Sequence, residues 1–331
     1  MLKLNFWFCS YSGFFHRFQV YSYSVIQNNL KSEPDKKHLE IAVIVLTYNQ
    51  ETILHECLES ILSQKIDSAK LKIYVIDDAS TDETKFVIEK YHRRYPHMIF
   101  PVFHETNQYQ IGNAPELSTL KSITSSYVAF CDGDDYWIDE LKLEKQIQKF
   151  LQDESLSVVH TDYCFGKSIN SIIHLQARNE RDKQKAKRIR NSFDLIQGND
   201  IKKSTAMFRA SSLDFDLLER CIGIRAQDWL IAIGAGSKGG IFFIEDSTTC
   251  YRVSNAASFQ SLNQEGKLRI KDEVRWFCAT NLPEGELRYA FRKFLFRQEI
   301  RKLISEHPLY KIIRPFVLST RLLKFKAKNW T

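Results

Sequence analysis

Carboxylates placed directly after an apolar run are the clearest chemical signal in this sequence. Asp132, Asp134 and Asp135 follow residues 127–131, whose apolar character predicts a buried strand. Carboxylates at this spacing repel one another, and a bound cation relieves the repulsion. Oxygen ligands of this kind suit Mg²⁺ or Mn²⁺, and Gly133 lets the backbone approach a phosphate. The plainer alternative is an acidic turn that caps the next helix.

A second acidic group, Asp77 with Asp78 and Asp82, follows the apolar run of residues 73–76. Taken alone, this group is more typical of a helix cap. Ligands of open α/β sheets bind at the carboxyl ends of strands, however, so the two groups together predict one site for a metal ion and a phosphate. The end of the preceding strand would line the same edge with Thr47, Tyr48 and Asn49.

The elements that position these side chains alternate between strands and helices. Residues 41–47 are a continuous β-branched run, typical of a strand covered on both faces. The predicted elements that follow are helix 52–64, strand 71–76, helix 81–95, strand 99–103, helix 114–123 and a strand that starts at 127. This alternation predicts a mostly parallel sheet flanked by helices.

The second half is less regular. Its predicted elements are helix 139–151, strand 157–160, an exposed loop or solvated helix at 176–192, strand 204–208, helices 211–221 and 228–235, and strands 241–244 and 249–253.

Composition and charge exclude several classes of protein. The 331 residues are 44% hydrophobic, which indicates a globular protein with a sizeable core. The formal charge of +7 is concentrated in residues 287–331, which contain twelve Lys and Arg but only Glu299 and Glu306 as acidic residues. No recognised nucleic-acid-binding module accompanies this charge, so nucleic acid is not an expected partner. Seven cysteines without CxxC spacing indicate the reducing cytoplasm, and no apolar run reaches the roughly 18 residues of a membrane span.

Three regions follow from these patterns. Residues 1–40 are predicted to form an aromatic N-terminal extension and a polar linker, residues 41–260 the main domain, and residues 261–331 a basic helical C-terminal extension. Nine aromatic residues lie within the first 24, without the apolar stretch and cleavage site of a signal peptide. That segment is interpreted as a packed extension, a misassigned start or an interfacial membrane anchor.

The apolar residues of the C-terminal extension recur at helical spacing, with Lys and Arg around them. This pattern is typical of a helix that lies on an anionic membrane surface. The alternative is a helix packed on the domain with a solvated basic face. The predicted apolar face contains Phe291, Phe294, Leu295, Leu303 and Ile304.

Four motifs occur in a characteristic order: LTYNQE at 46–51, IDDASTD at 76–82, CDGDDYW at 131–137 and AQDWL at 226–230. In this order and spacing they resemble the family 2 glycosyltransferases, which are inverting enzymes with a GT-A fold. The resemblance implies an α/β, Rossmann-like GT-A domain over residues 41–260. It also implies a nucleotide-sugar donor and a bound Mn²⁺ or Mg²⁺.

The resemblance further implies roles for individual residues. Asp132 and Asp134 would form the DxD element that binds ribose, metal ion and diphosphate. Asp228 would be the general base, although its position is otherwise typical of an N-cap. Trp229 would stack on an acceptor sugar, with a core tryptophan as the alternative. The nucleotide-sugar contacts would come from Thr47, Tyr48, Asn49, Glu51, Asp77, Asp78, Asp132 and Arg252.

One position departs from the family pattern. Similar family members often have a histidine that reaches the metal ion or diphosphate where this chain has Ser254. Water can fill such a coordination position, because Mg²⁺ usually keeps several waters. The nearby Arg252 would pair with phosphate, or alternatively form a surface salt bridge.

These roles predict an enzyme that transfers a monosaccharide, from a UDP-sugar, to a carbohydrate or lipid-linked acceptor in surface polysaccharide synthesis. It would act in the cytoplasm or peripherally on the inner face of the cell membrane. One alternative is a non-catalytic relative that binds sugar nucleotide, suggested by Ser254 and the basic C-terminal extension. Another is a haloacid dehalogenase-type phosphohydrolase, which also has Asp-x-Asp after a strand but expects Thr or Val at the position of Tyr136.

Overall fold

The computed structural model of the chain describes residues 39–169, 172–253 and 262–306, and a compact unit begins at Leu39. The predictions for residues 1–38, which include most of the aromatic extension and linker, lie outside the described residues. So do Ser254 and the last part of the basic extension, residues 307–331.

The first half of the sheet is parallel. Its strands are β1 (Glu40–Thr47), β2 (Lys70–Asp77), β3 (Ile99–Phe103) and β4 (Tyr127–Phe130), connected by α1 (Leu54–Leu62), α2 (Thr84–Arg94) and α3 (Leu117–Ser122). They lie in the order β3, β2, β1, β4, and each neighbouring pair is parallel. β1 is buried on both faces, since Val43 and Ile44 belong to different cores. The predicted alternation of strand and helix is confirmed here.

The second half of the sheet mixes strand directions. It contains β5 (Tyr136–Trp137), β6 (Leu156–Ile169), β7 (Ile172–Ala177), β8 (Ala206–Arg209) and β9 (Gly240–Arg252). The order continues from β4 as β8, β6, β9, β5, with β7 paired to β6. Because β8 is antiparallel to both β4 and β6, the parallel pair β6 and β9 runs with the first four strands. Six of the nine described strands share one direction, which confirms the mostly parallel sheet.

β9 is one strand where the sequence predicts two. In its pairing with β6, Thr161 is opposite Ile244, but Asp162 is opposite Ser247. The two residues left over, Glu245 and Asp246, are exposed. The polar middle of the segment is therefore accommodated in an irregularity and does not end the strand.

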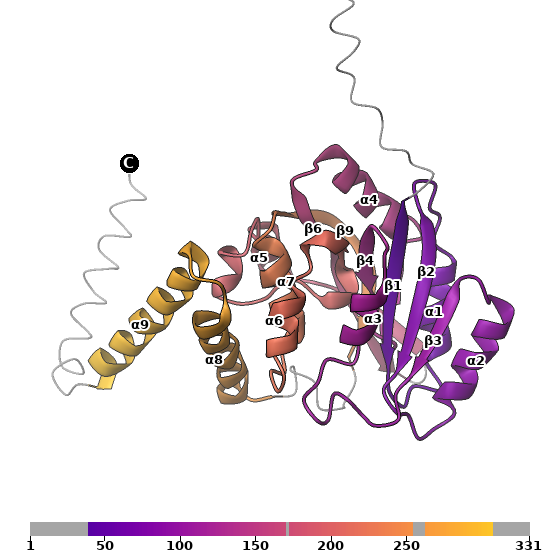
Figure 1. Cartoon of the computed structure of the whole chain (residues 1–331), viewed down its shortest axis with the longest axis horizontal. Helices are drawn as coiled ribbons and strands as arrows, with labels where there is room; N and C mark the ends of the chain where they lie inside the picture. Colours follow the sequence, from indigo (N-terminus) through magenta and orange to yellow (C-terminus); the bar gives the residue numbers. More distant parts are fainter. Residues whose placement is uncertain (1–38, 170–171, 254–261, 307–331) are drawn as a thin grey trace, which may run out of the picture. The chain divides into compact units, whose positions relative to one another are not determined.

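The helices cover both faces of the sheet (Figure 1). The remaining helices are α4 (Lys142–Gln152), α5 (Glu180–Lys187), α6 (Phe215–Arg220), α7 (Gln227–Gly236), α8 (Gln264–Asn281) and α9 (Glu286–Glu306), with 3₁₀ turns at Asp194–Ile196, Lys203–Thr205 and Ala210–Ser212. α1, α2 and α4 share one core through Leu58, Ile88 and Ile147. α3, α6 and α7 contribute to the other core, to which α8 and α9 add Val274 and Phe291.

The segment at 176–192 is only partly the exposed loop or solvated helix that the sequence predicts. It contains the end of β7 and all of α5. Arg178 is buried, and its Nη1 donates to Oδ1 of Asp162 at 2.9 Å. Its guanidinium also lies 4.5 Å from the ring centre of Tyr163. A buried ion pair therefore ties this segment to β6.

α9 uses most of its predicted membrane face to contact the domain. Phe291 is 0% exposed, Leu295 is buried, and Phe294 packs against the same core. The alternative interpretation, a helix packed on the domain, is correct for these three residues. Leu303 is exposed, and the side chain of Ile304 lies outside the described part. None of the helices described has both the length and the apolar composition that crossing a bilayer requires.

Candidate active site

The acidic turn after β4 packs against the end of β1. Gly133 N donates to the carbonyl of Leu46 at 2.9 Å. A Cβ added to Gly133 would lie 2.2 Å from Oε1 of Gln50 and 3.1 Å from Cβ of Thr47. A larger residue here would displace the Gln50 amide and crowd Thr47, so glycine permits the close packing of the two loops.

Among the described residues, no hydrogen bond reaches the side chain of Asp132, and the carboxylate of Asp134 accepts one only from its own backbone N–H. Burial raises the pKa of Asp132 to about 6; the charge of Lys203 opposes this shift and that of Asp134 adds to it. Burial also raises the pKa of Asp134, although Arg252 opposes the change. Two partly buried carboxylates that repel each other are a favourable place for a cation.

Lys203 lies among the carboxylates of this site. Its Nζ is 2.5 Å from Oε1 of Glu116, whose side chain is buried. Burial tends to lower the pKa of Lys203, but the charges of Glu116, Asp132 and Asp228 raise it above its ordinary value. Oε2 of Glu116 is buried and has no partner in the described part of the chain. Neither Lys203 nor Glu116 stands in a sequence motif that would have indicated its place.

Asp228 belongs to the same site although it comes from α7. The N-cap of α7 is Ala226, so Asp228 is the second residue of the helix and not its cap. Its Oδ2 accepts a hydrogen bond from Nδ2 of Asn199 at 3.2 Å. The charge of Asp228 contributes to raising the pKa of Asp132, which places both carboxylates within electrostatic reach of each other.

Ser204 stabilises the acidic turn through two hydrogen bonds. The sequence did not indicate this role. Oγ of Ser204 donates to Oδ2 of Asp135 at 2.6 Å and accepts from Asp132 N at 3.1 Å. The other oxygen of Asp135 accepts from Arg252 N at 3.0 Å. Asp135 is 2% exposed and uses both oxygens within the fold. Asp135 therefore holds the turn in place.

Asp77 and Asp78 of the second acidic group have different roles. Asp77 is fully buried; its Oδ2 accepts from Ser80 N at 3.1 Å, and its Oδ1 has no partner among the described residues. Asp78 accepts from Gln108 N at 2.7 Å and from Tyr109 N at 3.0 Å. The carboxylate of Asp78 therefore anchors the loop after β3, while Asp77 keeps an acceptor at the end of β2.

The loops after β1 and β2 are joined by side chains that were predicted to touch the nucleotide. Asn49, with φ at 50°, accepts from Thr81 N at 2.8 Å through Oδ1. Glu51 accepts from Glu83 N at 2.8 Å. These contacts hold the loops side by side, so Asn49 and Glu51 each have a structural partner. At the same edge Thr47 Oγ1 donates to Gln50 Oε1 at 2.7 Å, and Tyr48 is 38% exposed.

Arg252 is held beneath the acidic turn. Its Nε donates to the carbonyl of Asp134 at 2.8 Å, and its Nη2 lies 3.0 Å from Oε2 of Glu56. Only 12% of its side chain is exposed, so the surface salt bridge proposed as an alternative is largely enclosed. Arg252 thereby links the end of β9 to α1 and to the turn that contains Asp134.

Trp229 does not present its ring to an acceptor. The residue is 3% exposed and belongs to the core shared by α6 and α7. Its indole Nε1 donates to the carbonyl of Leu195 at 2.9 Å. The alternative interpretation as a core tryptophan is therefore correct, because a buried and hydrogen-bonded indole offers no face to a sugar.

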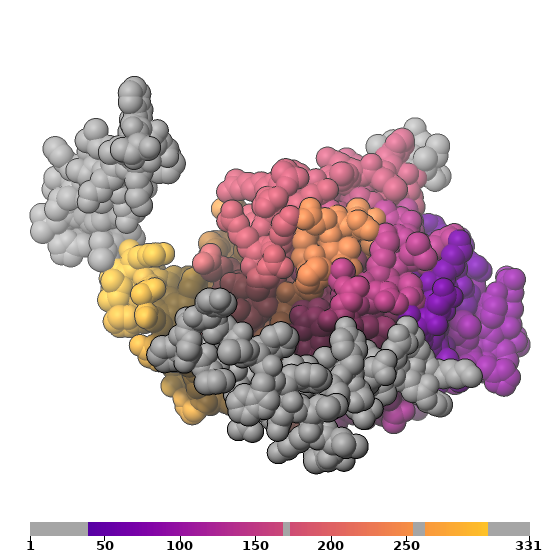
Figure 2. Space-filling view, turned by 90° about the horizontal axis from the view of Figure 1, so that it is seen from above, coloured from indigo at the N-terminus to yellow at the C-terminus, as the bar shows by residue number. Residues whose placement is uncertain are grey.

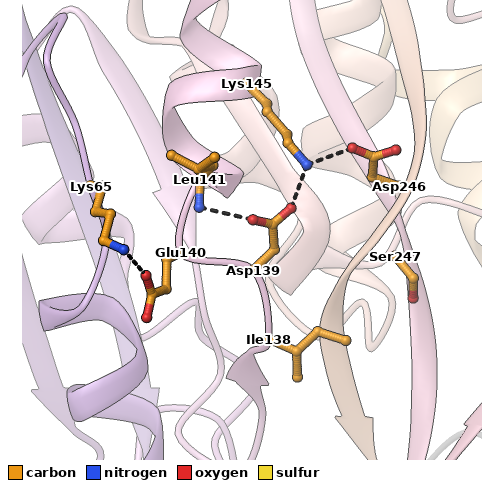
Figure 3. A pocket seen from close by; sticks show the side chains of 8 residues that line it. All are labelled: Lys65, Ile138, Asp139, Glu140, Leu141, Lys145, Asp246 and Ser247. Carbon is orange, nitrogen blue, oxygen red and sulfur yellow. Dashed lines mark hydrogen bonds and ion pairs between the residues drawn. The ribbon is translucent and has the colours of Figure 1, made fainter.

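A surface pocket of about 610 Å³ is lined by a different set of residues (Figure 3). Lys145 bridges Asp139 and Asp246 there, at 2.7 Å and 2.6 Å, and Lys65 pairs with Glu140. The acidic groups in this pocket are neutralised by neighbouring lysines. The pocket shares no residue with the site around Asp132, and its carboxylates are already paired.

The donor set fits a divalent cation only together with a substrate. Among the described residues, no group of three or more His, Cys, Asp or Glu side chains could hold a metal ion by itself. Mg²⁺ and Mn²⁺ take hard oxygen ligands, and Mg²⁺ is commonly held by one or two carboxylates plus phosphate oxygens and waters. Asp132 and Asp134 supply two such carboxylates, and a diphosphate would complete the coordination.

The parallel half-sheet, the acidic turn after β4 and the carboxylate on α7 define a GT-A α/β domain. The chain belongs to glycosyl transferase family 2, whose family profile matches residues 42–215. Solved structures agree on the fold. Staphylococcus aureus TarS 1–349 in complex with UDP-GlcNAc superposes with a TM-score of 0.54 at 20% identity, over 78% of this chain and 72% of that one.

Three further comparisons concern a solved structure and two sequence relatives. Mannosyltransferase PcManGT of Pyrobaculum calidifontis, solved with GDP-Man and Mn²⁺, has a TM-score of 0.51 at 20% identity, over 80% of this chain and 70% of that one. An uncharacterized protein of Mycobacterium tuberculosis is 29% identical over 64% of this chain and 58% of its own length. This chain thus spans under three fifths of that relative. TarS of S. aureus, a poly(ribitol-phosphate) beta-N-acetylglucosaminyltransferase, is 35% identical over 30% of this chain and 17% of its own length.

Proposed function

We propose that this protein is an inverting glycosyltransferase that moves a monosaccharide from a nucleotide sugar to a carbohydrate or lipid-linked acceptor. One observation supports the proposal: the charges of Asp132, after β4, and Asp228, on α7, both act on Lys203, so the two carboxylates lie within electrostatic reach of one cation. Such an arrangement supplies both requirements of the reaction, a place for the charged leaving group and a base for the acceptor. Membership of glycosyl transferase family 2 supports this function over a haloacid dehalogenase-type phosphohydrolase.

The residues divide the chemistry between them. A divalent cation held by Asp132 and Asp134 would neutralise the diphosphate that leaves. Asp228 accepts the proton of the acceptor hydroxyl while that oxygen attacks the anomeric carbon on the face opposite the leaving group. Attack from that face inverts the anomeric centre, and the nucleoside diphosphate leaves with the electron pair of the broken bond. Asn199, hydrogen-bonded to Asp228, orients the carboxylate for this step.

The relatives and the residues at the edge of the sheet support one choice of donor and acceptor. Asp77 and Thr47 would bind the nucleoside, and a UDP-sugar is the proposed donor, in line with the UDP-GlcNAc bound by TarS. TarS acts on poly(ribitol-phosphate) by its name, which supports surface polysaccharide synthesis here. The enzyme would work in the cytoplasm, peripherally on the inner face of the cell membrane.

The test is turnover of a panel of nucleotide sugars with Mn²⁺, measured as slow donor hydrolysis, together with thermal stabilisation by the same donors. Asp228→Asn should lower turnover about 10²-fold to 10⁴-fold while donor binding is kept. Asp216→Asn is the matched control, because Asp216 is also the second residue of a helix and is exposed. Full turnover by the Asp228 variant would remove Asp228 from the mechanism. Donor binding without turnover by the wild type would favour the non-catalytic alternative.

A further inference from the structure

α9 carries apolar side chains on two opposite faces. Phe291 and Leu295 face the core, as described above. The opposite side exposes Tyr289 by 64%, Phe296 by 68%, Ile300 by 39% and Leu303 by 56%. Their spacing of seven, four and three residues places them on one line along the helix, which we call the α9 stripe. A helix that is already packed on one side has no need of this second apolar face for folding.

A row of cations lies beside the α9 stripe. Lys293, Arg297 and Arg301 recur every four residues and are exposed. Neither Lys293 nor Arg297 forms an ion pair with a carboxylate in the part of the chain that the structure describes. The sequence after α9 continues the charge, since residues 307–331 contain six Lys and Arg and no Asp or Glu. Part of the surface of α9, in yellow, is uncovered in Figure 2.

We propose that the α9 stripe docks on an anionic lipid bilayer, with its apolar side chains in the interface and the cation row against lipid phosphates. Charge complementarity selects this partner. A second copy would bring one cation row close to another, whereas an anionic bilayer offers an apolar layer and negative charge together. Of the face that the sequence predicts, only Leu303 belongs to this docking surface, because Phe291, Phe294 and Leu295 pack on the domain.

The test is sedimentation of the full chain with phosphatidylglycerol vesicles at low and high salt. Wild-type protein should bind at low salt and keep part of its binding at high salt, because insertion of apolar side chains is not screened. The pair Phe296→Ser with Ile300→Ser should weaken partitioning at least about tenfold and make the remainder fully salt-sensitive. Lys293→Glu with Arg297→Glu should weaken binding mainly at low salt.

Matched controls lie on α2. Phe86 is 57% exposed there, so Phe86→Ser removes a similar side chain from another surface. Lys85→Glu with Lys90→Glu makes the same change in net charge. Equal binding losses in the α2 and α9 variants, or no binding to phosphatidylglycerol vesicles at low salt, would overturn the proposal. So would a dimer that the stripe variants abolish, or a clear fall in their unfolding temperature, since each would show that protein covers the stripe.

This inference rests on the proposed function at one point only: docking on a bilayer would bring the enzyme to a membrane-bound acceptor. Vesicle binding requires no sugar transfer, and donor hydrolysis in solution requires no vesicle. Hydrolysis by stripe variants that no longer bind vesicles would therefore separate the two, while vesicle binding by a protein with no turnover would leave the docking surface standing alone.

Discussion

Nζ of Lys203 lies 2.5 Å from Oε1 of Glu116, which joins the 3₁₀ turn before β8 to the N-cap residue of α3. Glu116 is 2% exposed, and 14% of the Lys203 side chain is exposed. An enclosed pair of this kind is costly to break on one side, because the remaining charge stays buried without a partner. The pair also sets the position of a cation on which the charges of both Asp132 and Asp228 act.

The first prediction concerns this pair. Lys203→Met should lower the free energy of unfolding by about 3–5 kcal/mol, because it leaves Glu116 buried and unpaired. Adding Glu116→Gln should recover most of the loss. The measurement is urea denaturation of the single and double variants. Lys121→Met is the control: its ion pair with Glu219 is 47% exposed on each side, so its loss should cost about 1 kcal/mol or less. Equal stability of the single and double variants would contradict the prediction.

The pKa of Asp132 predicts how stability depends on pH in the metal-free protein. Burial raises this pKa from 3.8 to about 6, so the folded state holds the proton more tightly than the unfolded state. The resulting stabilisation is present below about pH 4 and is lost as the pH rises through about 6. Two pKa units correspond to about 3 kcal/mol at most.

The measurement is the free energy of unfolding of wild-type protein and Asp132→Asn between pH 4 and pH 7. The variant cannot titrate at this position, so its curve should fall less steeply with rising pH. Some slope should remain, because the pKa values of Asp134 and Asp135 are raised as well. Parallel curves for the two proteins would show that Asp132 does not titrate in this window.

The alternating elements of the first half could be predicted because each carries its own signal. The run at 41–47 is apolar and β-branched. Such a continuous run indicates a strand buried on both faces, without information from any other segment. The order of the strands and the meeting of two acidic groups then follow from general rules for α/β sheets. The sequence therefore indicated the edge of the sheet that carries Asp77 and Asp132.

Roles that depend on tertiary contacts could not be predicted. β5 is two residues long and exists only through its pairing with β9. Lys203 and Ser204 reach the site because the 3₁₀ turn before β8 lies beside β4, which no local pattern records. In the same way, Trp229 follows the candidate base in sequence but points into the core. Sequence identifies a motif, while only the fold decides which of its side chains face a ligand.

Gly133 gives a prediction about the packing of the acidic turn. Gly133→Ala should destabilise the fold by about 1–3 kcal/mol, because the new Cβ meets Gln50 and Thr47. The amide of Gln50 can move, but only by losing its hydrogen bond from Thr47. The added change Gln50→Ala should therefore restore part of the stability, as measured by denaturant unfolding. If the double variant is no more stable than Gly133→Ala, the amide of Gln50 is not the obstacle.

A substitution at Asp78 can distinguish a structural role of this side chain from a contact with the nucleotide. Asp78→Ala removes the acceptor for Gln108 N and Tyr109 N, which leaves two backbone donors of the loop after β3 without their partner. The expected loss is about 1–3 kcal/mol of stability, with faster proteolytic cleavage between residues 104 and 113. Asp77→Asn is the contrasting variant, because it keeps an acceptor for Ser80 N and should not expose that loop. If cleavage of the Asp78 variant is unchanged and nucleotide binding is weaker, the prediction is wrong. Asp78 would then contact the nucleotide, as the family resemblance implies.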